Sequence, residues 1–426
     1  MSLLIKGGRV VDPSQKIDGQ FDILIENGRI LRLEKNIKSS EASEVIEADG
    51  LIVSPGFIDL HAHLRDPGYE WKEDIETGSL AAVAGGITSV CAMANTEPVN
   101  DNPAITRYII EKAEKVGLCD VFPIGAITKG LKGEELAEIG LMVKAGVVAI
   151  SDDGETPKDS KLLRNAMDYA RSLGIPVFCH SEDKSLSSGG HMNEGYLSSY
   201  LGVPGMPKEA EDIGTMRDIL LAKLTKAHVH ICHVSSSGAL KIIEKAKKEG
   251  VNVTCEITPH HFTLTEEAVR NFDTNAKMCP PLRTEEDVKS CKEALKTGIA
   301  DVIATDHAPH TVDEKNVEFC KAPFGIIGFQ TMLSLSLNLV REGYLTLSQL
   351  IEKLSTKPAR IIRKNDIGTL KVGSRANITI FDENEEYVFT KEMIRSKSLN
   401  TPFLGWKLKG KVKFTIYNGK IVYKDL

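Results

Sequence analysis

The chain has 426 residues, of which 42% are hydrophobic and 26% charged, and its formal net charge is −6. These values are typical of a folded soluble protein, and the length suffices for one large α/β domain with a smaller companion. The negative balance and the lack of a basic cluster argue against a nucleic-acid partner, and no apolar run reaches the 18 residues that would predict a membrane span. Eight scattered cysteines without a Cys-x-x-Cys pair, and no N-terminal signal peptide, predict free thiols and a cytoplasmic location.

Both ends of the chain are rich in short strand-like runs. Alternating apolar and polar residues flank Asn27-Gly28 near the start of the chain and Asn418-Gly419 near its end. An Asn-Gly pair between two such runs is the strongest short signal for a β-hairpin. Because chain termini often lie close together, we expect the two flanks to meet in one small β domain.

Between these flanks, apolar strand-like runs alternate with amphipathic helical stretches. Eight β-run and helix repeats predict a (β/α)₈ TIM barrel over residues 53–365, with residues 1–52 and 366–426 forming the composite β domain. A doubly wound open sheet is the alternative fold, although no Gly-x-Gly-x-x-Gly follows the first run. The eight runs are Leu51–His61, Ile87–Ala94, Val121–Ile127, Val147–Ser151, Pro176–His180, His228–His233, Val251–Ile257 and Asp301–Thr305.

Side chains that bind metals stand at the ends of five of these runs. Each has an ordinary structural explanation by itself, such as a hydrogen-bonded buried histidine, a turn aspartate or a helix cap. In a barrel, however, the carboxyl ends of all eight strands face one mouth, so these side chains would converge there. They are His61 and His63 after the first run, Asp153 after the fourth, His180 after the fifth, His233 after the sixth and Asp306 after the eighth.

Four histidines and two aspartates suit a borderline divalent metal, Zn²⁺ first, with Mn²⁺ or Co²⁺ as substitutes. Six ligands are too many for one tetrahedral ion and suit two ions that share a carboxylate. Paired ions can activate a water and polarise a carbonyl, which predicts hydrolysis of an unreactive carbonyl compound or the reverse condensation. His228 and His230 lie within the sixth run, and we interpret them as structural residues.

With these residues in view, the chain resembles a dihydroorotase of the amidohydrolase superfamily, closest to the bacterial class I type. Two stretches match the signatures of that family, Asp59-Leu-His-Ala-His-Leu-Arg-Asp-Pro67 and Ala304-Thr-Asp-His-Ala-Pro-His310-x-x-x-x-Lys315. The resemblance runs essentially from end to end. It implies the amidohydrolase type of TIM barrel, a small β domain closed from both termini, and reversible cyclisation of N-carbamoyl-L-aspartate to L-dihydroorotate in pyrimidine biosynthesis.

The resemblance also implies roles for individual residues. One zinc ion would be held by His61, His63, Asp153 and Asp306, and a second by Asp153, His180 and His233, with Asp153 bridging the two. Asp306 would also be the catalytic proton shuttle. The substrate-binding residues that the resemblance implies are His63, Arg65, Asn95, His310, Phe324, Gly325 and Cys279.

Cys279 departs from the family pattern. The family usually has asparagine before Pro-Pro-Leu-Arg, whereas this sequence has cysteine there. A thiol cannot reproduce the paired donor and acceptor of an amide, so the substrate contact expected at this position is weakened. A small buried apolar role for Cys279 is an equally good interpretation.

Two other functions remain open at this stage. A hydantoinase- or allantoinase-like cyclic-amide hydrolase would use the same metals, but Arg65 and the absence of a carboxylated lysine at Ser151-Asp-Asp-Gly154 argue against it. An inactive scaffold for aspartate transcarbamoylase would be expected to lose metal ligands, and all six are present. The expected partners are a small-molecule substrate, further copies of the chain in a homo-oligomer, and an aspartate transcarbamoylase.

Overall fold

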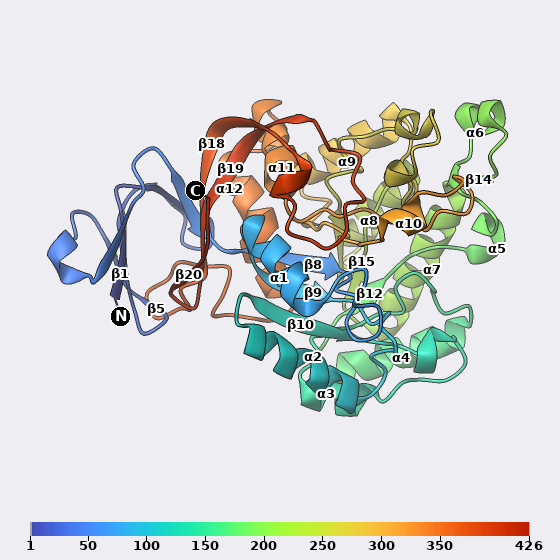
Figure 1. Cartoon of the computed structure of the whole chain (residues 1–426). Coiled ribbons are helices and arrows are strands. Elements are labelled where there is room, and N and C mark those ends of the chain that lie inside the picture. The colour runs from blue at the N-terminus through green and yellow to red at the C-terminus, as the bar shows by residue number, and fades with distance from the viewer. Residues whose placement is uncertain (1, 426) are drawn as a thin grey trace.

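A ring of eight parallel strands surrounded by helices forms the centre of the computed structural model, which describes residues 2–425 (Figure 1). A parallel bridge between Ala62 and His307 joins the last part of the ring to the first, and the His63 N–H donates to the His307 carbonyl at 2.8 Å. The predicted barrel is therefore confirmed, and the open sheet is excluded. In ring order the strands are β8 (Phe57–Ala62), β9 (Ile87–Ala92), β10 (Asp120–Gly125), β11 (Ala149–Ile150), β12 (Val177–Cys179), β15 (Val229–Ile231), β16 (Val253–Ile257) and β17 (Val302–Ile303).

The first predicted run contains two strands rather than one. β7 (Ile52–Pro55) pairs with strands of the β domain, and β8 begins the barrel after Gly56. A Cβ atom at Gly56 would lie 2.2 Å from the Thr88 hydroxyl, so only glycine fits where the chain passes from one sheet to the other.

Helices with clear sequence signals for their ends cover the barrel. Asp74 caps the first of them by accepting from the Thr77 N–H at 2.8 Å, and Gly174 and Gly298 end two others in the left-handed conformation. The longer helices are α1 (Ile75–Ala84), α2 (Pro103–Val116), α3 (Ile139–Ala145), α4 (Ser160–Leu173), α7 (Glu209–Thr225), α8 (Ser237–Lys248), α9 (Glu285–Thr297) and α11 (Met332–Arg341). Shorter elements are α5 (Lys184–Ser187), α6 (Tyr196–Leu201), β13 (Met192–Asn193), β14 (Gly205–Met206), α10 (Val312–Lys315), α12 (Leu347–Ile351) and α13 (Lys357–Ile361).

The β domain combines both ends of the chain, and Figure 1 shows the labelled termini on the same side of the barrel. Its six-stranded sheet has the order β20-β19-β18-β7-β2-β3, and a four-stranded sheet has the order β5-β4-β1-β6. Both Asn-Gly hairpins are present, with positive φ at Asn27, Gly28, Asn418 and Gly419. The remaining strands are β1 (Ser2–Lys6), β2 (Arg9–Asp12), β3 (Ile17–Gln20), β4 (Asp22–Glu26), β5 (Arg29–Glu34), β6 (Glu44–Glu47), β18 (Ile378–Val388), β19 (Lys407–Tyr417) and β20 (Lys420–Lys424).

The eight cysteines are free thiols, and six of them are buried. Across residues 2–425, none of the helices has both the length and the apolar character needed to cross a membrane.

Candidate metal centre and active site

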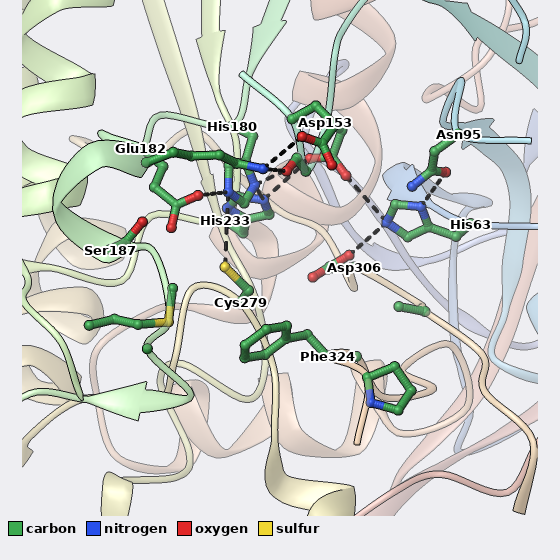
Figure 2. A pocket seen from close by; sticks show the side chains of 18 of the residues that line it. His63, Asn95, Asp153, His180, Glu182, Ser187, His233, Cys279, Asp306 and Phe324 are labelled. Carbon is green, nitrogen blue, oxygen red and sulfur yellow. Dashed lines mark hydrogen bonds and ion pairs between the residues drawn. The ribbon is translucent and has the colours of Figure 1, made fainter. Parts of the chain in front are cut away.

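The six predicted metal ligands lie together at the carboxyl-terminal mouth of the barrel. His61 is the next-to-last residue of β8, and its Nε2 atom lies 3.5 Å from Asp153 Oδ1 and 3.5 Å from Asp306 Oδ1. His63 Nε2 lies 3.1 Å from Asp306 Oδ1 and 3.5 Å from Asp153 Oδ2 (Figure 2). His61 and His63 therefore each lie within 3.5 Å of both aspartates.

The other two histidines approach Asp153 as well. His180 Nδ1 lies 3.6 Å and His233 Nε2 lies 3.5 Å from Asp153 Oδ1. Asp153 consequently lies between two pairs of imidazoles, and Figure 2 shows its carboxylate between His63 and the pair His180 and His233.

Unsatisfied polar atoms at the centre of this cluster fit a bound cation. Among residues 2–425, His61 Nε2 and Asp153 Oδ1 are buried and have no hydrogen-bond partner. Buried polar atoms are normally paired, so an imidazole nitrogen and a carboxylate oxygen that face each other unpaired are explained by a metal between them. Burial would raise the pKa of Asp153, but the imidazoles of His61, His180 and His233 around it lower that pKa well below its usual value, which favours the ionised ligand form.

Among residues 2–425, four groups of side chains place their ligand atoms within 4.8 Å of one another. Two of these groups fall in the centre just described, and the other two combine one histidine of that centre with residues outside it. The groups are His61, His63 and Asp306; His61, Asp153 and His233; His61, Cys232 and Glu256; and His180, Glu182 and Cys279.

Glu256 on β16 is a site residue that our sequence analysis missed. Its fully buried carboxylate accepts the Nδ1–H of His61 at 2.7 Å, the backbone N–H of His233 at 3.1 Å and the Nε2–H of His230 at 3.0 Å. These bonds place the proton of His61 on Nδ1 and leave Nε2 free to face the aspartates. The available signal was a charged residue inside the apolar run that ends at Ile257.

Three of the predicted site residues have a left-handed backbone. The φ angles are +62° at Arg65, +32° at His233 and +49° at Asp306. Such conformations cost about 1–3 kcal/mol each for residues other than glycine and collect at functional sites. Here they turn three side chains at strand ends toward the mouth of the barrel.

A cavity of about 620 Å³ opens beside the metal ligands. All the predicted substrate-binding residues line it, namely His63, Arg65, Asn95, Cys279, His310, Phe324 and Gly325. Arg65 Nε donates to the Pro309 carbonyl at 3.2 Å, and its guanidinium lies 3.4 Å from His310 Nε2. Asn95 Oδ1 accepts from His63 Nδ1 at 2.9 Å, which links this residue to a predicted metal ligand.

Two buried lysines hold the loop that carries Phe324. Lys277 donates to the Ala322 carbonyl at 2.7 Å and lies 4.6 Å from the centre of the Phe324 ring, while Lys315 donates to the Pro323 carbonyl at 2.7 Å. Burial lowers the pKa of Lys277 to about 8 and that of Lys315 to about 7. The position of the loop therefore depends on two desolvated amines.

Comparisons with known proteins agree with this site. A family model described as dihydro-orotase-like matches residues 50–239, and one described as the amidohydrolase family matches residues 243–423. The curated dihydroorotase of Geobacter metallireducens is 55% identical over 424 residues, with 100% of each chain covered. The chain belongs to the dihydroorotase family. The dihydroorotase of Acetivibrio thermocellus is 51% identical, with 99% of each chain covered.

Solved structures show that the chain shares its fold with hydantoinases. The L-hydantoinase (dihydropyrimidinase) of Arthrobacter aurescens superposes with a TM-score of 0.88 at 26% identity, covering 99% of this chain and 96% of that one. A D-hydantoinase from a Thermus species gives a TM-score of 0.83 at 24% identity, covering 99% and 95% of the two chains. Membership of the amidohydrolase family, together with the grouped ligands, indicates that the site binds a metal.

Proposed function

We propose that the chain is a metal-dependent dihydroorotase, which interconverts N-carbamoyl-L-aspartate and L-dihydroorotate in de novo pyrimidine biosynthesis. The observation that carries this proposal is the full-length similarity to dihydroorotases at 51–55% identity. Asp153, three residues after β11, supports it further, because resemblance to a hydantoinase would imply a carboxylated lysine in this stretch and no lysine stands there.

For the metal, we propose zinc. His61, His63, Asp153 and Asp306 would hold one ion, and Asp153, His180 and His233 a second; the unpaired His61 Nε2 and Asp153 Oδ1 support this assignment. When bound, the metal supplies an activated water and polarises the carbonyl of the substrate.

Asp306 is proposed as the proton shuttle. Burial favours the neutral acid, but the neighbouring His61 and the His63 hydrogen bond outweigh burial and lower the pKa of Asp306 well below its usual value. The group therefore starts as a carboxylate that can accept a proton at the cavity wall. In ring opening it would deliver that proton to the leaving ring nitrogen, and in ring closure it would remove the proton from the same nitrogen.

Arg65 and Asn95, helped by His310, are proposed to bind the carboxylate end of the substrate, because a guanidinium can pair with both oxygens of a carboxylate. His63 is proposed as a further substrate contact. Main-chain groups of Phe324 and Gly325 would contact the dihydropyrimidine ring. Cys279 lines the same cavity without the amide that the family usually has there, so its contribution to substrate binding is proposed to be weak.

The test is ring opening of L-dihydroorotate by the purified protein, before and after chelation and zinc add-back, with hydantoin and allantoin alongside. Metal-dependent turnover confined to dihydroorotate is the expected result. Turnover only of the other two rings would replace the substrate assignment by a hydantoinase-like one, which the shared fold makes the second candidate. A zinc-loaded protein inactive on all three rings would point instead to the inactive scaffold.

The enzyme family implies a small-molecule substrate. From the resemblance alone, we propose that the chain forms a homo-oligomer and a complex with aspartate transcarbamoylase. Light scattering gives the molar mass of the protein by itself, which tests the first proposal, and of its mixture with the transcarbamoylase, which tests the second.

A further inference from the structure

We propose that His180, Glu182 and Cys279 form an additional binding site for a thiophilic divalent cation, such as Zn²⁺ or Cd²⁺, on the wall of the cavity. The site shares His180 with the centre around Asp153 and uses the opposite ring nitrogen of that histidine. The three side chains would bind the cation whatever the substrate of the enzyme is.

The geometry of the three side chains suits one ion. His180 Nε2 lies 3.2 Å from Glu182 Oε2 and 4.0 Å from Cys279 Sγ, and all three ligand atoms lie within 4.8 Å of one another (Figure 2). Ligands around one tetrahedral zinc are about 3.3–3.8 Å apart, given Zn–N and Zn–S bonds of about 2.1 and 2.3 Å. Side-chain shifts of about an ångström or less would therefore close the site, with water as the fourth ligand.

His180 separates this site from the central one. Its Nδ1 faces Asp153 and His233, whereas its Nε2 faces Glu182 and Cys279. A cation on the Nε2 side would share the ring with the central metal, each ion being bound by one ring nitrogen of His180. Binding displaces one proton from the Cys279 thiol and one from Nε2 if that atom carries it, and both go to solvent.

The chemistry of the three groups selects the cation. A thiolate, an imidazole and a carboxylate favour zinc or cadmium over magnesium and calcium, which prefer oxygen ligands only. Cys279 and Glu182 are half-buried and line the open cavity, so an ion can reach them from solvent. The asparagine that the family usually has at this position supplies no thiolate, so the site depends on the departure at Cys279.

The experiment is a Cd²⁺ titration of the zinc-loaded protein, followed by the ultraviolet thiolate-to-cadmium charge-transfer band and by the metal content after gel filtration. The natural chain is expected to bind one further cation and to show the band. Glu182→Gln and Cys279→Ser should each weaken this binding by roughly tenfold or more, since even outer-shell changes cost that much. Cys320→Ser, which removes the exposed thiol, is the matched control and should leave binding unchanged.

A band that persists in Cys279→Ser would overturn the proposal, because another thiol would then be the ligand. The proposal would also be overturned if the band were lost in Cys279→Ser but were as strong in Glu182→Gln as in the natural chain. The Cys279 thiol alone would then suffice to bind cadmium. Circular dichroism checks each variant, and Cys279→Asn replaces the serine variant if that one does not fold. None of these results depends on turnover, so failure of the dihydroorotase assignment would be recognised separately.

Discussion

The Nδ1–H of His61 donates to Glu256 Oε1 across 2.7 Å, and both side chains are fully buried. Burial opposes the charge on Glu256, but His61 and His230 outweigh it and hold the pKa of Glu256 well below its usual value. The carboxylate thus orients one predicted metal ligand through its side chain and another, His233, through its backbone.

Replacing Glu256 by glutamine keeps the shape of the side chain and removes its charge. We expect the affinity for metal to fall about 10–100-fold, because a buried carboxylate that accepts from a ligating histidine raises the basicity of that ligand. Competition with a chromogenic chelator measures the change. Glu244→Gln, at an exposed pair with Lys248 on α8, is the control and should bind metal normally. Equal metal affinities in the Glu256 and Glu244 variants would show that Glu256 does not position the metal-binding histidines.

Asp306→Asn should keep the fold, because asparagine tolerates the left-handed backbone at this position, where φ is +49°. Loss of a general acid–base group typically costs about 10²–10⁴-fold in rate, so turnover should fall by at least that much. Since Asp306 is also a proposed ligand, metal content is measured on the same samples. The exposed Asp313→Asn serves as the control. Normal rates in the Asp306 variant would refute the shuttle.

Arg65→Lys should raise KM for dihydroorotate more than it changes kcat. Lysine retains the charge but not the planar fork, and loss of a charged hydrogen bond of about 1.5–3 kcal/mol corresponds to a roughly 10–150-fold drop in kcat/KM. Steady-state kinetics in both directions measure the effect. Arg164→Lys on the exposed face of α4 should behave like the natural chain, and a similar KM in both variants would assign the substrate carboxylate to other residues.

Lys315 should make the protein more stable as the pH rises above 7. Burial lowers its pKa in the folded chain to about 7, whereas an unfolded lysine titrates near 10.4. Between these values the unfolded chain binds a proton that the folded chain lacks, so the free energy of unfolding increases with pH. Urea unfolding at pH 7 and 9.5 should show a smaller increase for Lys315→Met than for the natural chain, by an amount on the order of a few kcal/mol at most.

Lys321→Met, at an exposed position in the same loop region, is the control for this experiment and should retain the pH dependence of the natural chain. A Lys315→Met protein with an unchanged increase would show that Lys315 keeps its proton when buried.

The sequence by itself determined the elements and their order. Helices alternate with strands along the barrel as the pattern of apolar runs and helical stretches predicts, and both Asn-Gly pairs lie in hairpins. These features could be predicted because they depend on local physics, namely the period of apolar residues, the caps and the backbone freedom of Asn-Gly. The convergence of the predicted metal ligands from five strand ends could be foreseen as well, since a parallel barrel brings all these ends to one mouth.

Only the tertiary structure decided which side chains orient the predicted ligands and hold the loop at the mouth of the barrel. Glu256 contacts His61, which lies 195 positions away in the chain. Lys277 and Lys315 hold a loop by donating to backbone carbonyls, and because every residue has such a carbonyl, the sequence does not mark these contacts. The division of the first run at Gly56 likewise follows from the close approach of Thr88 on a neighbouring strand. Contacts between residues so far apart depend on strand register and side-chain packing, which no local pattern of the sequence specifies.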